Sequence, residues 1–193
     1  MSHISTAVEY ALHTLLYIID LPEEAAAPSS KDLATLRALP VKFMAGVMTK
    51  LNKAGIIVAT EGMRGGIRLA RPAEDISFYD VVVAVDGQKA LFDCRNVRHA
   101  CPLYGQTPPA WATSGVCGIH AVMLEADARM KDVLKARTLR DMADQAAKRV
   151  PSEFRAETRM WLENQAQTRR QRSHMPQDIL KSAKVPEIQR CQK

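Results

Sequence analysis

The chain has 193 residues, of which 47% are hydrophobic and 25% are charged, the balance of a globular protein long enough to bury a core. No stretch approaches the roughly 18 consecutive apolar residues that a membrane span needs. The formal net charge is +6, and residues 168–193 hold seven Lys or Arg against two acids. This basic balance favours contact with a polyanion, with a solvated, disordered tail as the alternative for the last segment.

The opening sequence MSHISTAVEY lacks the basic region and long apolar run of a secretory signal, so we expect a cytoplasmic protein. In a reducing compartment, the four cysteines of this chain are more often metal ligands or redox-active groups than disulfides.

The first predicted helix runs from Thr6 to about Leu21, and Thr6 and Glu9 have the spacing of a capping box. Its predicted buried stripe consists of Val8, Leu12, Leu15 and Ile19. Glu9 and His13 are one turn apart and share a different face. Taken alone, that pair indicates a surface contact between the two side chains.

The stretch 29–70 has the outline of a winged helix-turn-helix. Ser29 or Ser30 caps a short helix, and Pro40 ends it and opens a second helix. The predicted buried face of the second helix consists of Val41, Met44, Val47, Met48 and Leu51. Two short strands, 56–60 and 66–70, then flank a glycine-rich turn and predict a hairpin.

In a winged helix-turn-helix, the second helix enters the DNA major groove and the hairpin forms the wing. A small α+β core that binds no DNA is the alternative. Lysines along the second helix, a glycine that leaves room for close backbone approach, and an arginine at the hairpin tip favour DNA. The candidate DNA-contacting residues are Ser30, Lys31, Lys42, Gly46, Lys50, Arg64 and Arg68.

After the hairpin, Ser77 and Asp80 mark the start of a helix that ends at Gly87. An irregular stretch, 88–118, follows and is rich in proline and glycine. It contains Cys94, Cys101 and Cys117. A loop of this length is uncommon unless it has a function.

A long helix is predicted from Ile119 to about Ala136, with apolar residues close to a heptad seam. The seam consists of Ile119, Met123, Ala126, Met130 and Val133. We expect this helix to pair with its copy in a dimer, and packing against its own domain is the alternative. A short helical segment at 138–147 and a further helix from Pro151 precede the basic tail.

These segments together resemble the Rrf2 (Rrf-two) family of bacterial winged-helix regulators over residues 2–147. The resemblance rests on the opening STAVEYALHTLLYI, on LNKAGII, on the wing ending in RLARPAEDI, on the helix DVVVAVDG, and on a cysteine-bearing loop before a long helix. Several family members hold an iron–sulfur cluster in that loop. Their DNA affinity changes when the cluster is oxidised, lost or nitrosylated.

The first helix is similar to the VEWALH motif of the RsrR-like members, in which a glutamate and a histidine of one subunit and two loop cysteines of the other ligate a two-iron two-sulfur cluster. The resemblance implies Glu9, His13, Cys94 and Cys117 as the ligands here. Cys101 departs from that pattern and is the reserve ligand of a four-iron four-sulfur cluster, which other members hold with three loop cysteines at closer spacing.

The sequence thus predicts a mainly α fold with a small β wing. Its predicted parts are a winged helix-turn-helix domain (1–87), a sensor loop (88–118), a dimerisation helix region (119–147) and a C-terminal helical extension with a basic tail (148–193). The predicted function is a homodimeric regulator that binds a palindromic double-stranded DNA operator and senses redox state, nitric oxide or iron through an iron–sulfur cluster.

Two alternatives keep the fold and change the function. One is a cluster-free thiol or zinc switch, and the other is a protein-interaction subunit without an operator. An enzyme is the least favoured class, because no nucleophile motif, phosphate loop or dinucleotide fingerprint is visible.

Overall fold

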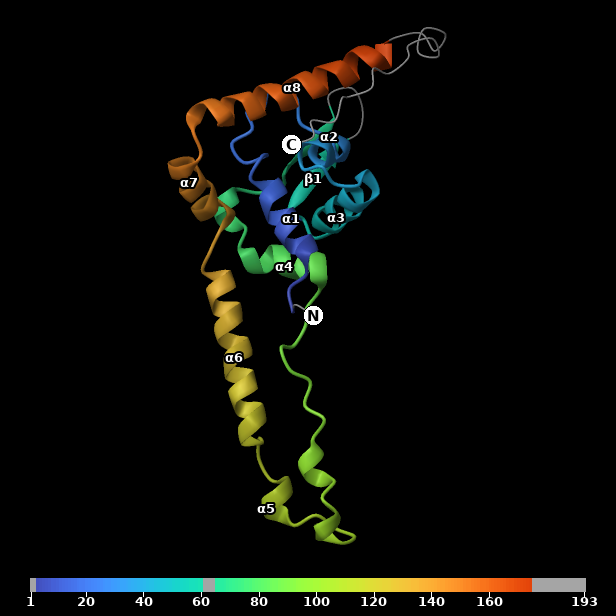
Figure 1. Cartoon of the computed structure of the whole chain (residues 1–193), viewed down its shortest axis with the longest axis vertical. Coiled ribbons are helices and arrows are strands. Elements are labelled where there is room, and N and C mark those ends of the chain that lie inside the picture. Colours follow the sequence, from blue (N-terminus) through green and yellow to red (C-terminus); the bar gives the residue numbers. More distant parts are fainter. Residues whose placement is uncertain (1–2, 61–64, 175–193) are drawn as a thin grey trace, which may run out of the picture.

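The computed structural model describes residues 3–60 and 65–174. Its elements in chain order are α1 (Thr6–Leu15), α2 (Ser30–Leu36), α3 (Val41–Lys53), β1 (Ile57–Thr60), β2 (Gly66–Leu69), α4 (Phe78–Asp86), α5 (Ala110–Thr113), α6 (Gly118–Lys135), α7 (Leu139–Arg149) and α8 (Ser152–His174), with short 3-10 helices at Ala73–Asp75, Val97–His99 and Pro102–Tyr104. The predicted fold class, mainly α with a small β wing, is confirmed (Figure 1). None of the helices in the described part of the chain has the length and hydropathy to cross a membrane.

Local capping signals set the starts of α2, α4 and α7. Each begins with a complete capping box, in which a serine or threonine accepts from the third helical N–H and an aspartate accepts from the cap's own N–H. The pairs are Ser29 with Asp32, Ser77 with Asp80, and Thr138 with Asp141. The predicted start and end of α4 are therefore confirmed, and the cap of α2 is Ser29.

Helix α1 begins at Thr6 as predicted, but its predicted cap and its predicted end are wrong. Its N-cap is Ser5, whose N–H and hydroxyl donate to the Asp86 carboxylate at the end of α4, 2.8 and 2.6 Å away. This contact with a distant part of the chain replaces the expected capping box of Thr6. The helix ends at Leu15, and turns follow up to Asp20, which has a left-handed φ of 59°.

The core lies between α1, α2, α3, α4 and the hairpin. In α3, four of the five predicted apolar positions are buried, but Val41 is wrong because it is 46% exposed at the start of the helix. Pro40 is the N-cap of α3 rather than its first residue. The two strands pair in antiparallel register, with Ile57 opposite Leu69, and the turn at 61–64 lies outside the described residues.

Helix α6 and the loop before it extend away from this core, with α5 at the far end (Figure 1). No residue of α6 is buried, and its seam residues Ile119 and Val133 are 68% and 65% exposed. Helix α7 returns the chain to the domain, where the N–H of Leu139 donates to the Ile76 carbonyl. The pairing of α6 with a second copy stays a prediction.

Candidate functional site

Helix α3 has the two faces that a DNA-reading helix needs. Met44, Val47, Met48 and Leu51 point into the core. The opposite face exposes Lys42 and Gly46, and an added Cβ at Gly46 would meet nothing within 4 Å. The structure thus leaves these two predicted DNA-contacting residues on an open surface.

Two other predicted DNA-contacting residues bind the protein's own backbone. The Lys50 ammonium donates to the Val85 carbonyl near the end of α4, 2.6 Å away. The Arg68 guanidinium donates to the Leu21, Pro22 and Glu23 carbonyls at 3.3, 2.9 and 3.0 Å, and also to the Ala25 carbonyl. Lys50 therefore holds α3 against α4, and Arg68 holds β2 against the segment after α1. The predicted contact of both residues with DNA stays untested.

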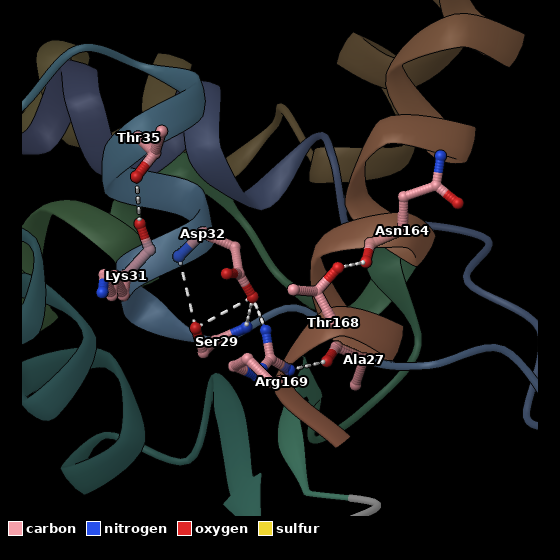
Figure 2. Close-up of polar contacts among 8 residues, drawn as sticks. All are labelled: Ala27, Ser29, Lys31, Asp32, Thr35, Asn164, Thr168 and Arg169. Atoms are coloured by element: carbon pink, nitrogen blue, oxygen red, sulfur yellow. Dashed lines mark hydrogen bonds and ion pairs between the residues drawn. The ribbon is translucent and has the colours of Figure 1, made fainter. Parts of the chain in front are cut away.

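The remaining predicted DNA contacts belong to α2 and to the wing tip. Lys31 is exposed in the first turn of α2, and its side chain points away from Arg169 of α8 (Figure 2). Ser30 next to it is half-buried. Arg64 lies outside the described residues.

The cysteine-bearing loop is held in shape by Arg98. Its guanidinium donates to the Ser114, Thr113 and Gly115 carbonyls at 3.1, 3.3 and 2.5 Å. These contacts join the 3-10 helix Val97–His99 to the end of α5, just before Cys117. This role of Arg98 leaves no signal in the sequence, because its partners are backbone carbonyls.

The start of the loop runs alongside α6. The N–H of Leu91 donates to Asp127 of α6, and the rings of Phe92 and His120 lie 6.1 Å apart. Phe92 is two positions before Cys94, and His120 is three positions after Cys117. These contacts hold the segment before Cys94 alongside α6, against Asp127 in the middle of the helix and His120 in its first turn.

The surroundings of Cys117 favour its thiolate form. It is the N-cap of α6, and the nearby backbone N–H groups of His120 and Ile119 lower the pKa of its thiol, with the charge of Arg98 as a smaller cause. A helix N-terminus stabilises a thiolate in this way. Cys94, Cys101 and Cys117 are all free thiols and half-buried.

The other predicted ligands, Glu9 and His13, are exposed on α1, which belongs to the core domain rather than to the loop. Across residues 3–60 and 65–174, no three or more His, Cys, Asp or Glu side chains gather where they could hold a metal ion. One copy of the chain therefore does not assemble the predicted site, whose ligands were expected from two subunits.

The fold is that of a winged-helix protein in which the cysteine-bearing loop and α6 extend away from the core. The model of the Rrf2 family, described as an iron-dependent transcriptional regulator, matches residues 4–145. The chain belongs to this family of transcriptional regulators. It is therefore a regulator rather than an enzyme.

Individual relatives agree with this assignment. The chain is 33% identical to the rrf2 protein of Nitratidesulfovibrio vulgaris over 119 residues, which is 62% of this chain and 73% of that protein. It is 29% identical to the transcriptional regulator NsrR of Halalkalibacterium halodurans over 140 residues, which is 72% of this chain and 88% of that protein.

Solved structures show the same fold. IscR of T. potens superposes with a TM-score of 0.57 at 22% identity, covering 78% of this chain and 93% of that one. CymR, the global cysteine regulator of B. subtilis, superposes with a TM-score of 0.55 at 21% identity, covering 75% of this chain and 98% of that one. The family match ends at residue 145, before α8 begins.

Proposed function

We propose that the chain is a homodimeric regulator that binds a palindromic DNA operator and senses redox state, nitric oxide or iron through an iron–sulfur cluster. The observation that carries the proposal is the position of Cys117. It lies at the N-terminal end of α6, with a lowered thiol pKa, on a helix that exposes Ile119, Val122, Leu124 and Val133. The same helix thus offers a thiolate ligand and a surface for a second copy.

The dimer supplies the geometry for reading DNA. Pairing of α6 with its copy removes exposed apolar side chains such as Ile119 and Val133 from water, which favours association. A palindrome is read by two recognition helices about one turn of DNA apart, so two copies of α3 at a fixed separation are required.

The donor set suits iron–sulfur chemistry, because thiolates are the usual ligands of such clusters. Cys94 and Cys117 of one subunit with Glu9 and His13 of the other form the proposed set for a two-iron two-sulfur cluster, and Cys101 is the reserve ligand for a four-iron cluster. When bound, a cluster supplies a group that changes charge on oxidation and is lost on attack by oxidants or nitric oxide.

The chain's own residues would transmit that change. Arg98 holds the loop against the end of α5, and Glu9 and His13 lie on α1 of the DNA-reading domain. Ligands from both parts would tie the orientation of that domain to the state of the site. Both Glu9 and His13 can be protonated, which makes a mixed site easier to open than one made of thiolates alone.

The test is the visible absorbance of protein purified without oxygen, compared among four cysteine-to-alanine variants. We expect the absorbance bands to disappear in Cys94→Ala and Cys117→Ala and to remain in Cys101→Ala. Cys191→Ala is the matched control, because Cys191 belongs to the tail and not to the loop. Loss in all three loop variants indicates a four-iron cluster, and bands that survive removal of both Cys94 and Cys117 contradict the ligand set.

A cluster-free thiol or zinc switch is the second candidate, favoured by the lowered pKa of the Cys117 thiol. Colourless protein that contains zinc, or thiols that titrate as free, supports this candidate. A third candidate function is a protein-interaction subunit without an operator. Specific binding to DNA upstream of the chain's own gene excludes it.

A further inference from the structure

Helix α8 lies beyond the part of the chain that matches the family, yet it packs onto the DNA-reading domain (Figure 1). It is anchored from its middle towards its C-terminal end. Leu162 and Ala166 are buried, and Leu162 and Trp161 join the hydrophobic core. Its N-terminal half is more exposed, and a groove of about 940 Å³ runs between it and α1 and α7.

Arg169 makes the polar contacts at the anchored end (Figure 2). Its guanidinium forms an ion pair with Asp32 of α2 and donates to the Ala27 carbonyl 3.1 Å away. The Asp32 side chain is only 5% exposed. A carboxylate so nearly buried needs a charged partner, and Arg169 is the partner that the structure provides.

The same carboxylate oxygen of Asp32 also holds the start of α2. Its Oδ2 accepts from the N–H and the hydroxyl of Ser29, at 2.8 and 2.9 Å. Arg169 therefore contacts the capping box that begins the helix-turn-helix. Next to Asp32, Lys31 is a proposed DNA contact, so neutralising Asp32 also removes a negative charge that would repel phosphate.

Ala27 links Arg169 to the wing. The segment 21–28 between α1 and α2 is bound from the other side by β2, through the Arg68 guanidinium and through the N–H of Ile67, which donates to the Pro28 carbonyl 2.8 Å away. Gly66 at the start of β2 lies so close to Ala27 that an added Cβ would be 2.3 Å from its carbonyl oxygen. The segment is thus held between α8 and the base of the wing.

From these contacts we propose that α8 contributes to DNA binding by the winged helix-turn-helix domain, and that Arg169 is a positioning residue for operator binding. Arg169 fixes the α2 capping box and the segment 21–28, and through that segment it fixes the base of the wing relative to α3. This inference rests on the proposed function, since it assigns α8 a role in binding the operator.

The test compares Arg169→Gln with Arg155→Gln in the full chain. The control removes the same charge from an exposed position on the same helix. Operator affinity is measured over a range of salt concentrations, and hydrogen exchange is measured at the Ile67 amide. We expect Arg169→Gln to weaken operator binding about five-fold or more and to speed exchange at Ile67, with the control unchanged.

The salt dependence separates positioning from direct contact. Loss of a phosphate contact lowers the slope of log affinity against log salt by about 0.9, whereas loss of a positioning residue leaves the slope unchanged. Weakened binding with a reduced slope overturns the inference, and so does wild-type affinity with wild-type exchange at Ile67.

If Arg169→Gln does not fold, Arg169→Lys decides, with Arg155→Lys as its control. Lysine keeps the charge beside Asp32 but lacks the planar fork that reaches both Asp32 and the Ala27 carbonyl. We then expect faster exchange at Ile67 than in the control, and equal exchange overturns the inference. If the wild-type chain and the controls bind no operator, the proposed function fails, while exchange at Ile67 still reports whether Arg169 holds the wing.

Discussion

Two glycine-to-alanine substitutions in the winged helix-turn-helix domain should change the free energy of unfolding in opposite directions. At Gly66, the new Cβ would lie 2.3 Å from the Ala27 carbonyl oxygen, a backbone atom that cannot rotate away as a side chain could. The segment or the strand must move, which breaks the 2.8 Å hydrogen bond from Ile67 to the Pro28 carbonyl. Leaving buried backbone groups unpaired costs about 1–3 kcal/mol, so we expect at least that loss from the free energy of unfolding.

At Gly46, the same change meets nothing within 4 Å, and the residue lies inside α3. Alanine in a helix interior is more stable than glycine by about 1 kcal/mol. Gly46→Ala should therefore raise the free energy of unfolding and still weaken operator binding, because the added methyl group stands on the surface that approaches DNA.

The assay is urea unfolding of both variants, followed by operator titration of Gly46→Ala. A wild-type unfolding midpoint for Gly66→Ala would show that β2 is not packed against Ala27. Unchanged operator affinity for Gly46→Ala would show that this face of α3 does not approach the DNA closely.

Three further outcomes follow from the structure. Burial raises the pKa of Asp86, but hydrogen bonds from Ser5 outweigh burial, so the pKa is lowered overall. The stability that Asp86 supplies is therefore present above about pH 4 and is lost as the pH falls through its folded pKa. The free energy of unfolding of Asp86→Asn should fall less steeply with acid than that of the wild type. Replacing Met123 and Met130 with aspartate should give monomers by sedimentation, and a persistent dimer would place the interface elsewhere. Lys42→Ala should cost about 1–3 kcal/mol of operator binding if the lysine reads a base, and equal affinity at moderate salt would remove that role.

Local signals in the sequence predicted most elements of the fold. The capping box of Ser77 and Asp80 gave the start of α4, because all of its atoms lie within one turn. The matching spacing of Thr6 and Glu9 failed, because the cap is Ser5, whose N–H and hydroxyl donate to Asp86 far along the chain. Capping signals therefore predict the cap residue only where no distant contact fixes a neighbouring residue in that position.

The candidate site was harder to predict from the sequence, because the partners of its residues also lie far along the chain. Their charge and position made Lys50 and Arg68 candidates for contact with DNA. In the structure they donate hydrogen bonds to carbonyls of α4 and of the segment 21–28 instead. Arg169 showed no local sign of its pairing with Asp32, since the partner is at the other end of the chain. The proposed ligand set is divided between two subunits, so one copy of the chain does not bring it together.

The central claim is that this regulator's affinity for DNA depends on a cluster. It is tested most directly by measuring operator affinity, iron and sulfide on one sample prepared without oxygen, before and after oxidation. We predict iron and sulfide in equal amounts, and a change in operator affinity of about five-fold or more when the cluster is oxidised or lost. Protein without iron and sulfide, or the same operator affinity in both states, would contradict the account.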